Sequence, residues 1–105
     1  MSSEENKEYE DLASLLEAGF ILTKKTISGE SQELLDEAQD TADKLHTIGA
    51  AIISSGMEMA FQKVREGNAT EANGLIQVVK LMTDVMDSRK NTLNSFIKQK
   101  KEEKN

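Results

Sequence analysis

The 105-residue sequence contains no cysteine, no proline and no tryptophan, and each absence excludes something. Without cysteine there is neither a disulfide framework nor a thiolate, as is common in cytosolic proteins. Without proline, nothing forces a helix to kink or end. Only three Phe and one Tyr are present, so any hydrophobic core is thin and mostly aliphatic. Thin cores on long helices are usually completed by another chain.

Groups that carry catalysis are also missing. His46 is the only histidine, which excludes Ser/His/Asp and Cys/His arrangements and any histidine-based metal cluster. Asp36, Glu37, Asp40 and Asp43 have helical spacing, but the Glu-x-x-His pairs of a di-metal bundle are absent, which favours a solvated acidic face. No glycine-rich loop joins a strand to a helix. We therefore predict a protein that is not an enzyme and uses no cofactor or metal.

Long hydrophobic runs are absent as well. The longest uncharged segment is Thr47 to Met57, whereas a membrane-spanning helix needs about 20 apolar residues. The first residues are acidic and have no apolar core, unlike a secretory signal. The sequence thus predicts a soluble protein of the cytoplasm (the host cytoplasm if the protein is viral) without a membrane partner.

The net charge of −6 is unevenly distributed. Residues 1–44 carry twelve Asp and Glu against four Lys, whereas residues 45–105 carry nine Lys and Arg against seven Asp and Glu. Solvated helix faces are the favoured interpretation of this pattern. The alternative is that the acidic segment is a binding face for a protein partner.

The clearest positive signal is a seven-residue repeat on two long segments. Alternating steps of three and four residues keep one apolar stripe of a helix pointing at a partner. The first stripe comprises Leu35, Ala38, Ala42, Leu45, Gly49, Ile52, Gly56 and Met59, and the second comprises Leu75, Val79, Met82, Met86, Arg89, Leu93 and Phe96. No alternating strand pattern occurs, so we predict an all-α fold built on a long antiparallel helical hairpin.

Helix boundaries follow from the capping signals. We expect one domain over residues 1–105, with helices at about 4–26, 30–66 and 69–98 and frayed, charged termini. Gly29 suits the left-handed residue after the first helix, and Asn68 with Glu71 has the spacing of a capping box after Gly67. The alternative for the second helix is a bend or break near Gly49.

The second half of the 30–66 helix is apolar around more than one stripe, so it needs more than one neighbour. Small residues spaced seven apart at Ala42, Gly49 and Gly56 allow another helix backbone to approach closely. Packing in an oligomeric helical assembly satisfies both features. The predicted oligomer interface consists of Leu45, Gly49, Ile52, Ile53, Gly56, Met59, Ala60, Leu75, Val79, Met82 and Met86.

Residues 41–100 also resemble a known structure, the central oligomerisation hairpin of tailed-phage terminase small subunits. The similar features are Ala42-Asp43-Lys44-Leu45, Gly56, Glu71-Ala72, the run Leu75 to Met82, and Leu93. The resemblance implies two long paired helices that associate side by side into a ring, regulate a packaging motor and engage viral DNA. It also implies that the lysines near the chain's end, Lys98, Lys100 and Lys101, contact nucleic acid.

Three functional hypotheses stay open. The first is an oligomeric assembly or adaptor protein that binds itself, including the phage DNA-packaging type. The second is a small acidic binding protein that inhibits or regulates a basic partner through residues 30–43. The third is a helical-hairpin secretion substrate or chaperone of the WxG type, although the Trp-x-Gly turn is absent.

Overall fold

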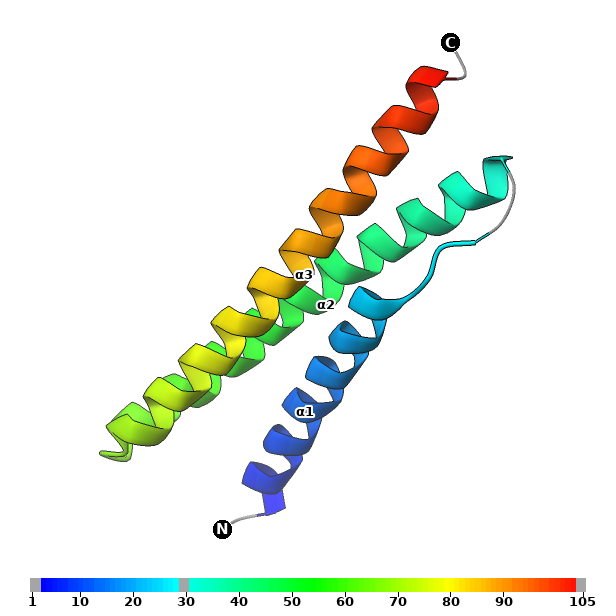
Figure 1. The fold of residues 1–105 in the computed structure, drawn as a ribbon. Helices are drawn as coiled ribbons and strands as arrows, with labels where there is room; N and C mark the ends of the chain where they lie inside the picture. Colours follow the sequence, from blue (N-terminus) through cyan, green and yellow to red (C-terminus); the bar gives the residue numbers. More distant parts are fainter. Residues whose placement is uncertain (1–2, 29–30, 104–105) are drawn as a thin grey trace.

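Three α-helices account for nearly all of residues 3–28 and 31–103, the part of the chain that the computed structural model describes. They are α1 (Ser3–Lys24), α2 (Ser31–Arg65) and α3 (Ala69–Glu103). α2 and α3 run antiparallel as a long hairpin, and α1 lies alongside both, so the molecule is a rod of 58 × 21 × 16 Å (Figure 1). The predicted all-α fold with a helical hairpin and an N-terminal helix is confirmed.

The turn of the hairpin is built from local backbone chemistry. Gly67 has a φ of +82°, which a residue without Cβ adopts at little cost. Its N–H donates to the carbonyl of Val64, and the Asn68 N–H donates to that of Lys63, the paired bonds of a Schellman motif. The Asn68 side chain then accepts from the Glu71 N–H at 3.1 Å and caps α3. The predicted turn at Gly67-Asn68 is therefore confirmed, and it needs only three residues between the helices.

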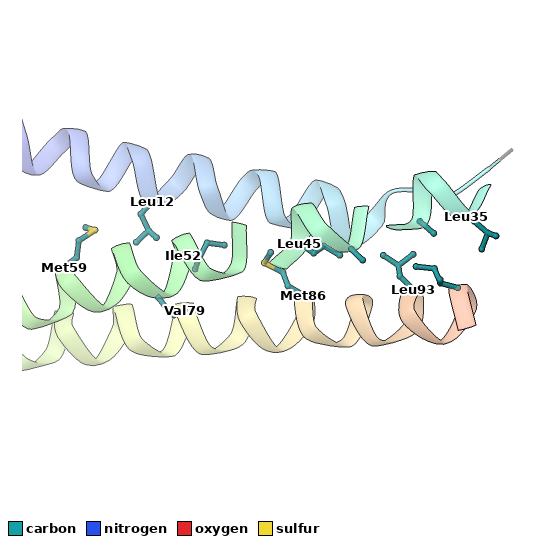
Figure 2. Close-up of a cluster of buried hydrophobic side chains, with 11 residues drawn as sticks. Leu12, Leu35, Leu45, Ile52, Met59, Val79, Met86 and Leu93 are labelled. Atoms are coloured by element: carbon teal, nitrogen blue, oxygen red, sulfur yellow. The ribbon is translucent and has the colours of Figure 1, made fainter. Parts of the chain in front are cut away.

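The core lies along the predicted stripes, and Figure 2 shows its side chains pointing inward between the helices. Leu12 is the buried member from α1. The buried members from the hairpin include Leu35, Ala38, Ala42, Leu45, Ile52 and Met59 of α2 and Val79, Met86, Leu93 and Ile97 of α3. Each large aliphatic side chain removed from water contributes roughly 1.5–3 kcal/mol, which makes this seam the main source of stability.

At two glycines, side chains of a neighbouring helix occupy the space that a Cβ would need. A Cβ built on Gly56 would overlap Cγ2 of Val79 across the hairpin. A Cβ on Gly19 would lie 2.9 Å from the Met86 sulfur, so α1 also crosses α3 at close range. At Gly49 the nearest atom would be a Met86 methyl at 3.7 Å, an ordinary contact. The close packing expected at Gly56 is confirmed. Both close neighbours, Val79 at Gly56 and Met86 at Gly19, belong to the same chain.

Helix ends differ from the predictions by a few residues. α2 continues through Gly49 without a break, so the alternative of an interrupted helix is wrong. α1 ends at Lys24 because the next N–H, that of Lys25, donates to the Leu22 carbonyl only three residues back. α3 runs to Glu103, five residues past its predicted end, with Lys100 bonded to Glu103 in the last turn. The predicted left-handed residue, Gly29, lies outside the described residues.

The hydropathy of the helices agrees with this packing. Within residues 3–28 and 31–103, no helix is both long enough and apolar enough to cross a membrane.

Candidate interaction surfaces

The residues predicted to join copies are mostly covered by this chain's own helices. Seven of the eleven are buried, namely Leu45, Ile52, Gly56, Met59, Ala60, Val79 and Met86. Gly49, Leu75 and Met82 are half-buried, and Ile53 alone is exposed, at 48%. The structure therefore brings these residues together inside one protomer.

The physical reason is the position of α1. The apolar circumference of α2 does need a second neighbour, as the sequence indicates, and α1 supplies it within the same chain. Any contact between copies has to use side chains outside the heptad stripes. The structure contains such side chains. Phe61 and Val64 belong to the apolar surplus expected on the second half of the 30–66 helix, but of these residues the predicted interface includes only Ile53, and the exposed apolar residues of α1 and α3 were not assigned to it.

Among the described residues, nine large hydrophobic side chains are exposed, and most of them lie in one part of the hairpin. They are Phe20, Ile21, Ile53, Phe61, Val64, Ile76, Val78, Leu81 and Val85. Seven of them lie in the segments of α2 and α3 next to the turn, residues 53–65 and 69–85, which we call the turn half. We call residues 31–52 and 86–103 the open half, and none of its large hydrophobic side chains is among the exposed ones.

One exposed group, the α2 patch, comprises Ile53, Phe61 and Val64. Their spacing of eight and three residues places them on one side of α2. Ile53 also lines a surface cavity of about 160 Å³ with Thr83 of α3, on a side to which α1 contributes no residue. Ile76 lies seven residues before Thr83 and so extends the α2 patch onto α3.

A second group, the α3 patch, comprises Val78, Leu81 and Val85, of which Leu81 is the most exposed at 68%. Val78 and Val85 share a helical row with Met82, which approaches Gly19 of α1. The α3 patch therefore borders α1, whereas the α2 patch lies on the other side of α3. Both patches are visible in the sequence as apolar residues at helical spacing beside the heptad stripes.

The open half has a charged exterior instead. Asp36, Asp40 and Asp43 of α2 are exposed, and Asp40 pairs with Lys44 at 3.0 Å. On α3, Lys98 and Lys101 are exposed one helical turn apart. The third lysine of the predicted nucleic-acid contact, Lys100, is engaged with Glu103 at 3.3 Å and lies over the Phe96 ring at 5.8 Å. Lys98 and Lys101 face solvent, and neither forms an ion pair with a described residue.

Lys63 joins all three helices near the turn. Its side chain is only 12% exposed, and its ammonium pairs with Glu71 at 3.3 Å and with Glu66 at 3.5 Å. The ammonium also lies 5.4 Å from the centre of the Tyr9 ring of α1. The pKa of Lys63 is raised above its ordinary value, first by its hydrogen bond with Tyr9 and then by Glu71, while desolvation opposes the rise.

A larger cavity of about 380 Å³ opens where α1 ends against α3. Its walls are apolar side chains mixed with threonines and cations: Ile27, Leu93, Phe96, Thr23, Thr26, Thr92, Lys24, Lys25 and Arg89. Arg89 is the residue that interrupts the predicted stripe. It donates from Nη2 to the Lys25 carbonyl at 2.6 Å, so it caps the end of α1.

These features define an all-α, three-helix protein whose surface offers apolar patches and one cationic cavity. No three His, Cys, Asp or Glu side chains of residues 3–28 and 31–103 gather closely enough to hold a metal ion. Comparisons of the chain with protein-family models, with curated proteins and with solved structures found no match.

Proposed function

We propose that this protein is a non-enzymatic assembly or adaptor protein and that its main partner is another copy of itself. The observation that carries the proposal is the concentration of exposed apolar side chains on the turn half. A helix that is apolar around most of its circumference is normally buried. Between Leu75 and Met86, α3 has apolar residues facing the core and two further sides.

The exposed apolar area is suited to an interface. Half-exposed side chains of this size present on the order of 100 Å² each. The two patches with Ile76 contain seven such side chains and together expose roughly 700 Å², so each contact of roughly 800 Å² per partner would combine one patch with the polar residues around it. Monomers usually expose contiguous apolar patches of only about 300–600 Å². Covering both patches in an assembly removes this surface from water.

Two patches on different sides of α3 favour a heterologous contact, in which the α2 patch of one copy covers the α3 patch of the next. Such a contact repeats and gives a closed ring or an open filament, depending on the rotation between copies. A contact that used only one patch twice would give a dimer and leave the other patch in water. The heterologous arrangement covers both patches on every copy of a ring.

The experiment is to measure solution mass by light scattering after gel filtration, for the wild type and for two single variants. Phe61→Glu puts a charge in the α2 patch, and Leu81→Glu puts one in the α3 patch. Both positions are exposed in the protomer, so the fold should survive. Asn91→Glu, at an exposed α3 position of the open half, is the matched control.

We expect the wild type and Asn91→Glu to form a species larger than a dimer and each patch variant to be monomeric. An equimolar mixture of the two patch variants should then form dimers, because one intact α2 patch can still meet one intact α3 patch. A monomeric wild type would overturn the proposal. Monomeric variants whose mixture also stays monomeric would overturn the heterologous arrangement.

The resemblance to small terminase subunits suggests a more specific function for the assembly. In this version of the proposal, the assembly contributes to phage DNA packaging and contacts DNA. Lys98 and Lys101 support it because they are exposed on α3 at the end remote from the apolar patches. Replacing Lys98, Lys100 and Lys101 together with Gln should reduce the slope of log affinity against log salt for duplex DNA by about 2–3. An unchanged slope would remove DNA contact from the proposal.

A small acidic binding protein is the second candidate. The exposed Asp36, Asp40 and Asp43 favour it, since they form a continuous carboxylate edge on α2. This function predicts tight, salt-sensitive binding to a basic protein. Replacing the three residues with Asn should abolish that binding and leave the solution mass unchanged.

A further inference from the structure

The cavity at the end of α1 belongs to the open half and lies outside both patches. Its volume of about 380 Å³ falls within the range of small-molecule pockets. Ile27, Leu93 and Phe96 supply apolar walls, and Leu93 belongs to the buried core. The floor of the cavity is therefore the side of the bundle itself, which gives it a fixed shape.

Positive charge collects around this cavity although the protein carries a net charge of −6. Lys24, Lys25 and Arg89 all line it. Lys25 pairs with Glu37 at 3.6 Å, and Lys24 lies over the Phe20 ring at 4.2 Å. Arg89 forms no ion pair with any carboxylate of residues 7–28 and 32–103, whose side chains the structure describes. Among the side chains that the structure describes, Lys24 and Arg89 thus have no carboxylate partner.

Arg89 is also incompletely hydrogen-bonded. One terminal nitrogen donates to the Lys25 carbonyl, which offsets the negative end of the α1 dipole. The Nε–H is buried and has no acceptor. A buried donor without an acceptor is costly, and the N–H groups of a guanidinium can form paired bonds with the two oxygens of a carboxylate.

From these observations we propose that the cavity binds a small molecule made of one carboxylate and an apolar body. The carboxylate lies against Arg89 and the apolar body lies along Ile27, Leu93 and Phe96. A purely apolar ligand would leave Arg89 without a charge partner, and a highly charged one would place charge against the apolar walls. This inference goes beyond the proposed assembly and does not depend on it.

Octanoate is a suitable probe, and octylammonium is its counterpart with the opposite charge and a similar tail. Titrations followed by NMR should shift the methyl signals of Ile27 and Leu93 with octanoate, with a Kd on the order of 1 mM for so small a ligand. Octylammonium should leave the same signals in place. Equal binding of the two probes would show an apolar crevice without charge selection and would overturn the proposal.

Variants of this chain separate the contribution of the Arg89 charge to octanoate binding from that of the cavity volume. Arg89→Gln removes the charge and keeps a donor for the Lys25 carbonyl, so α1 should stay docked. It should weaken octanoate binding by about tenfold or more. Lys90→Gln is the matched control, because it makes the same charge change at the next residue, which lines the other cavity. Thr92→Phe fills the cavity without touching the charge and should abolish binding.

The result that supports the proposal is loss of octanoate binding in Arg89→Gln and Thr92→Phe with retention in Lys90→Gln. Undiminished binding in Arg89→Gln, or no methyl shift in the wild type, would overturn it. A monomeric wild type would overturn the assembly while leaving this titration interpretable, so the two proposals fail separately.

Discussion

The turn half and the open half of the hairpin are made by the same two helices, yet they treat apolar residues differently. In the open half, no large apolar side chain is exposed and the exterior is charged. In the turn half the stripe is just as well buried, and further apolar side chains lie outside it. In this protein the residues of the heptad stripe form the core within one chain. The apolar residues beside the stripe in the turn half stay exposed and are available for an interface.

The halves also differ in the contacts of their buried groups. The turn half contains Gly56, where an added Cβ would overlap Val79, and Lys63 of α2, whose ammonium pairs with Glu71 of α3 and lies near the Tyr9 ring of α1. The open half contains Arg89 with an unmatched Nε–H and Thr41 with a buried hydroxyl that has no partner. Among the described residues, both buried polar side-chain atoms without a hydrogen-bond partner therefore lie in the open half.

The largest expected effect tests close packing in the turn half. Gly56→Ala should destabilise the protein by about 1–3 kcal/mol, because the new methyl overlaps the branched side chain of Val79, which cannot move freely. Chemical denaturation measures the change. Adding Val79→Ala should recover part of the loss, so that the double variant is more stable than the sum of the two single changes.

Gly74→Ala is the control for this substitution. A Cβ at Gly74 meets no atom within 4 Å, so the better helix former should raise stability by about 0.5–1 kcal/mol. If Gly56→Ala and Gly74→Ala change stability in the same direction, the close approach of α2 and α3 is not what Gly56 provides.

The next effect concerns the link between α1 and the hairpin. Lys63→Met should lower the Tm, because Glu66, Glu71 and Tyr9 lose their shared cation, and amide exchange in α1 should accelerate more than in α3. Lys80→Met, at an exposed position of α3, should do neither.

The raised pKa of Lys63 gives this link a pH dependence. The ammonium is favoured in the folded state, so its contribution is complete below the unfolded lysine pKa of about 10.4 and is lost as the pH rises through the folded value. The stability difference between wild type and Lys63→Met should be constant from about pH 6 to about pH 9 and shrink above about pH 10. A difference that shrinks between about pH 6 and about pH 9 would assign the effect to other groups.

The smallest expected effect concerns a buried hydroxyl in the open half. Thr41 is fully buried and its hydroxyl has no hydrogen-bond partner. Thr41→Val keeps the shape and removes the unmatched hydroxyl, so we expect stability to rise by about 1 kcal/mol. Thr47→Val is the comparison, since the exposed Thr47 hydroxyl donates to the Asp43 carbonyl at 3.1 Å. A loss of stability in Thr41→Val would mean that the hydroxyl is satisfied in solution.

Local signals made most of the fold predictable. The stripes, the turn at Gly67 and the cap at Asn68 depend on residues a few positions apart, and all three are present. The place of α1 was harder, because its contacts join residues far apart in the sequence, such as Gly19 with Met86. No local pattern shows that a second neighbour comes from the same chain, so the burial within the chain of residues assigned to an oligomer interface could not be foreseen.

The candidate surfaces were less predictable than the fold for a related reason. Leu81 and Phe61 are ordinary apolar residues until the position of α1 is known, and only then does their exposure stand out. Arg89 was recognisable as an interruption of the stripe. Its role at the end of α1 required the position of the Lys25 carbonyl, which depends on where α1 stops.

The repeat in the seam between α2 and α3 is compatible with more than one register of the two helices. Gly56 meets Val79 and Gly49 meets Met86, so small residues seven apart on α2 face large residues seven apart on α3. A slide of seven residues would place Gly49 against Val79 and restore the same kind of pairing. The seam is thus nearly periodic, and the connection of three residues at Gly67 favours the observed register over the shifted one. A segment of three residues thereby helps to align two helices of 35 residues each.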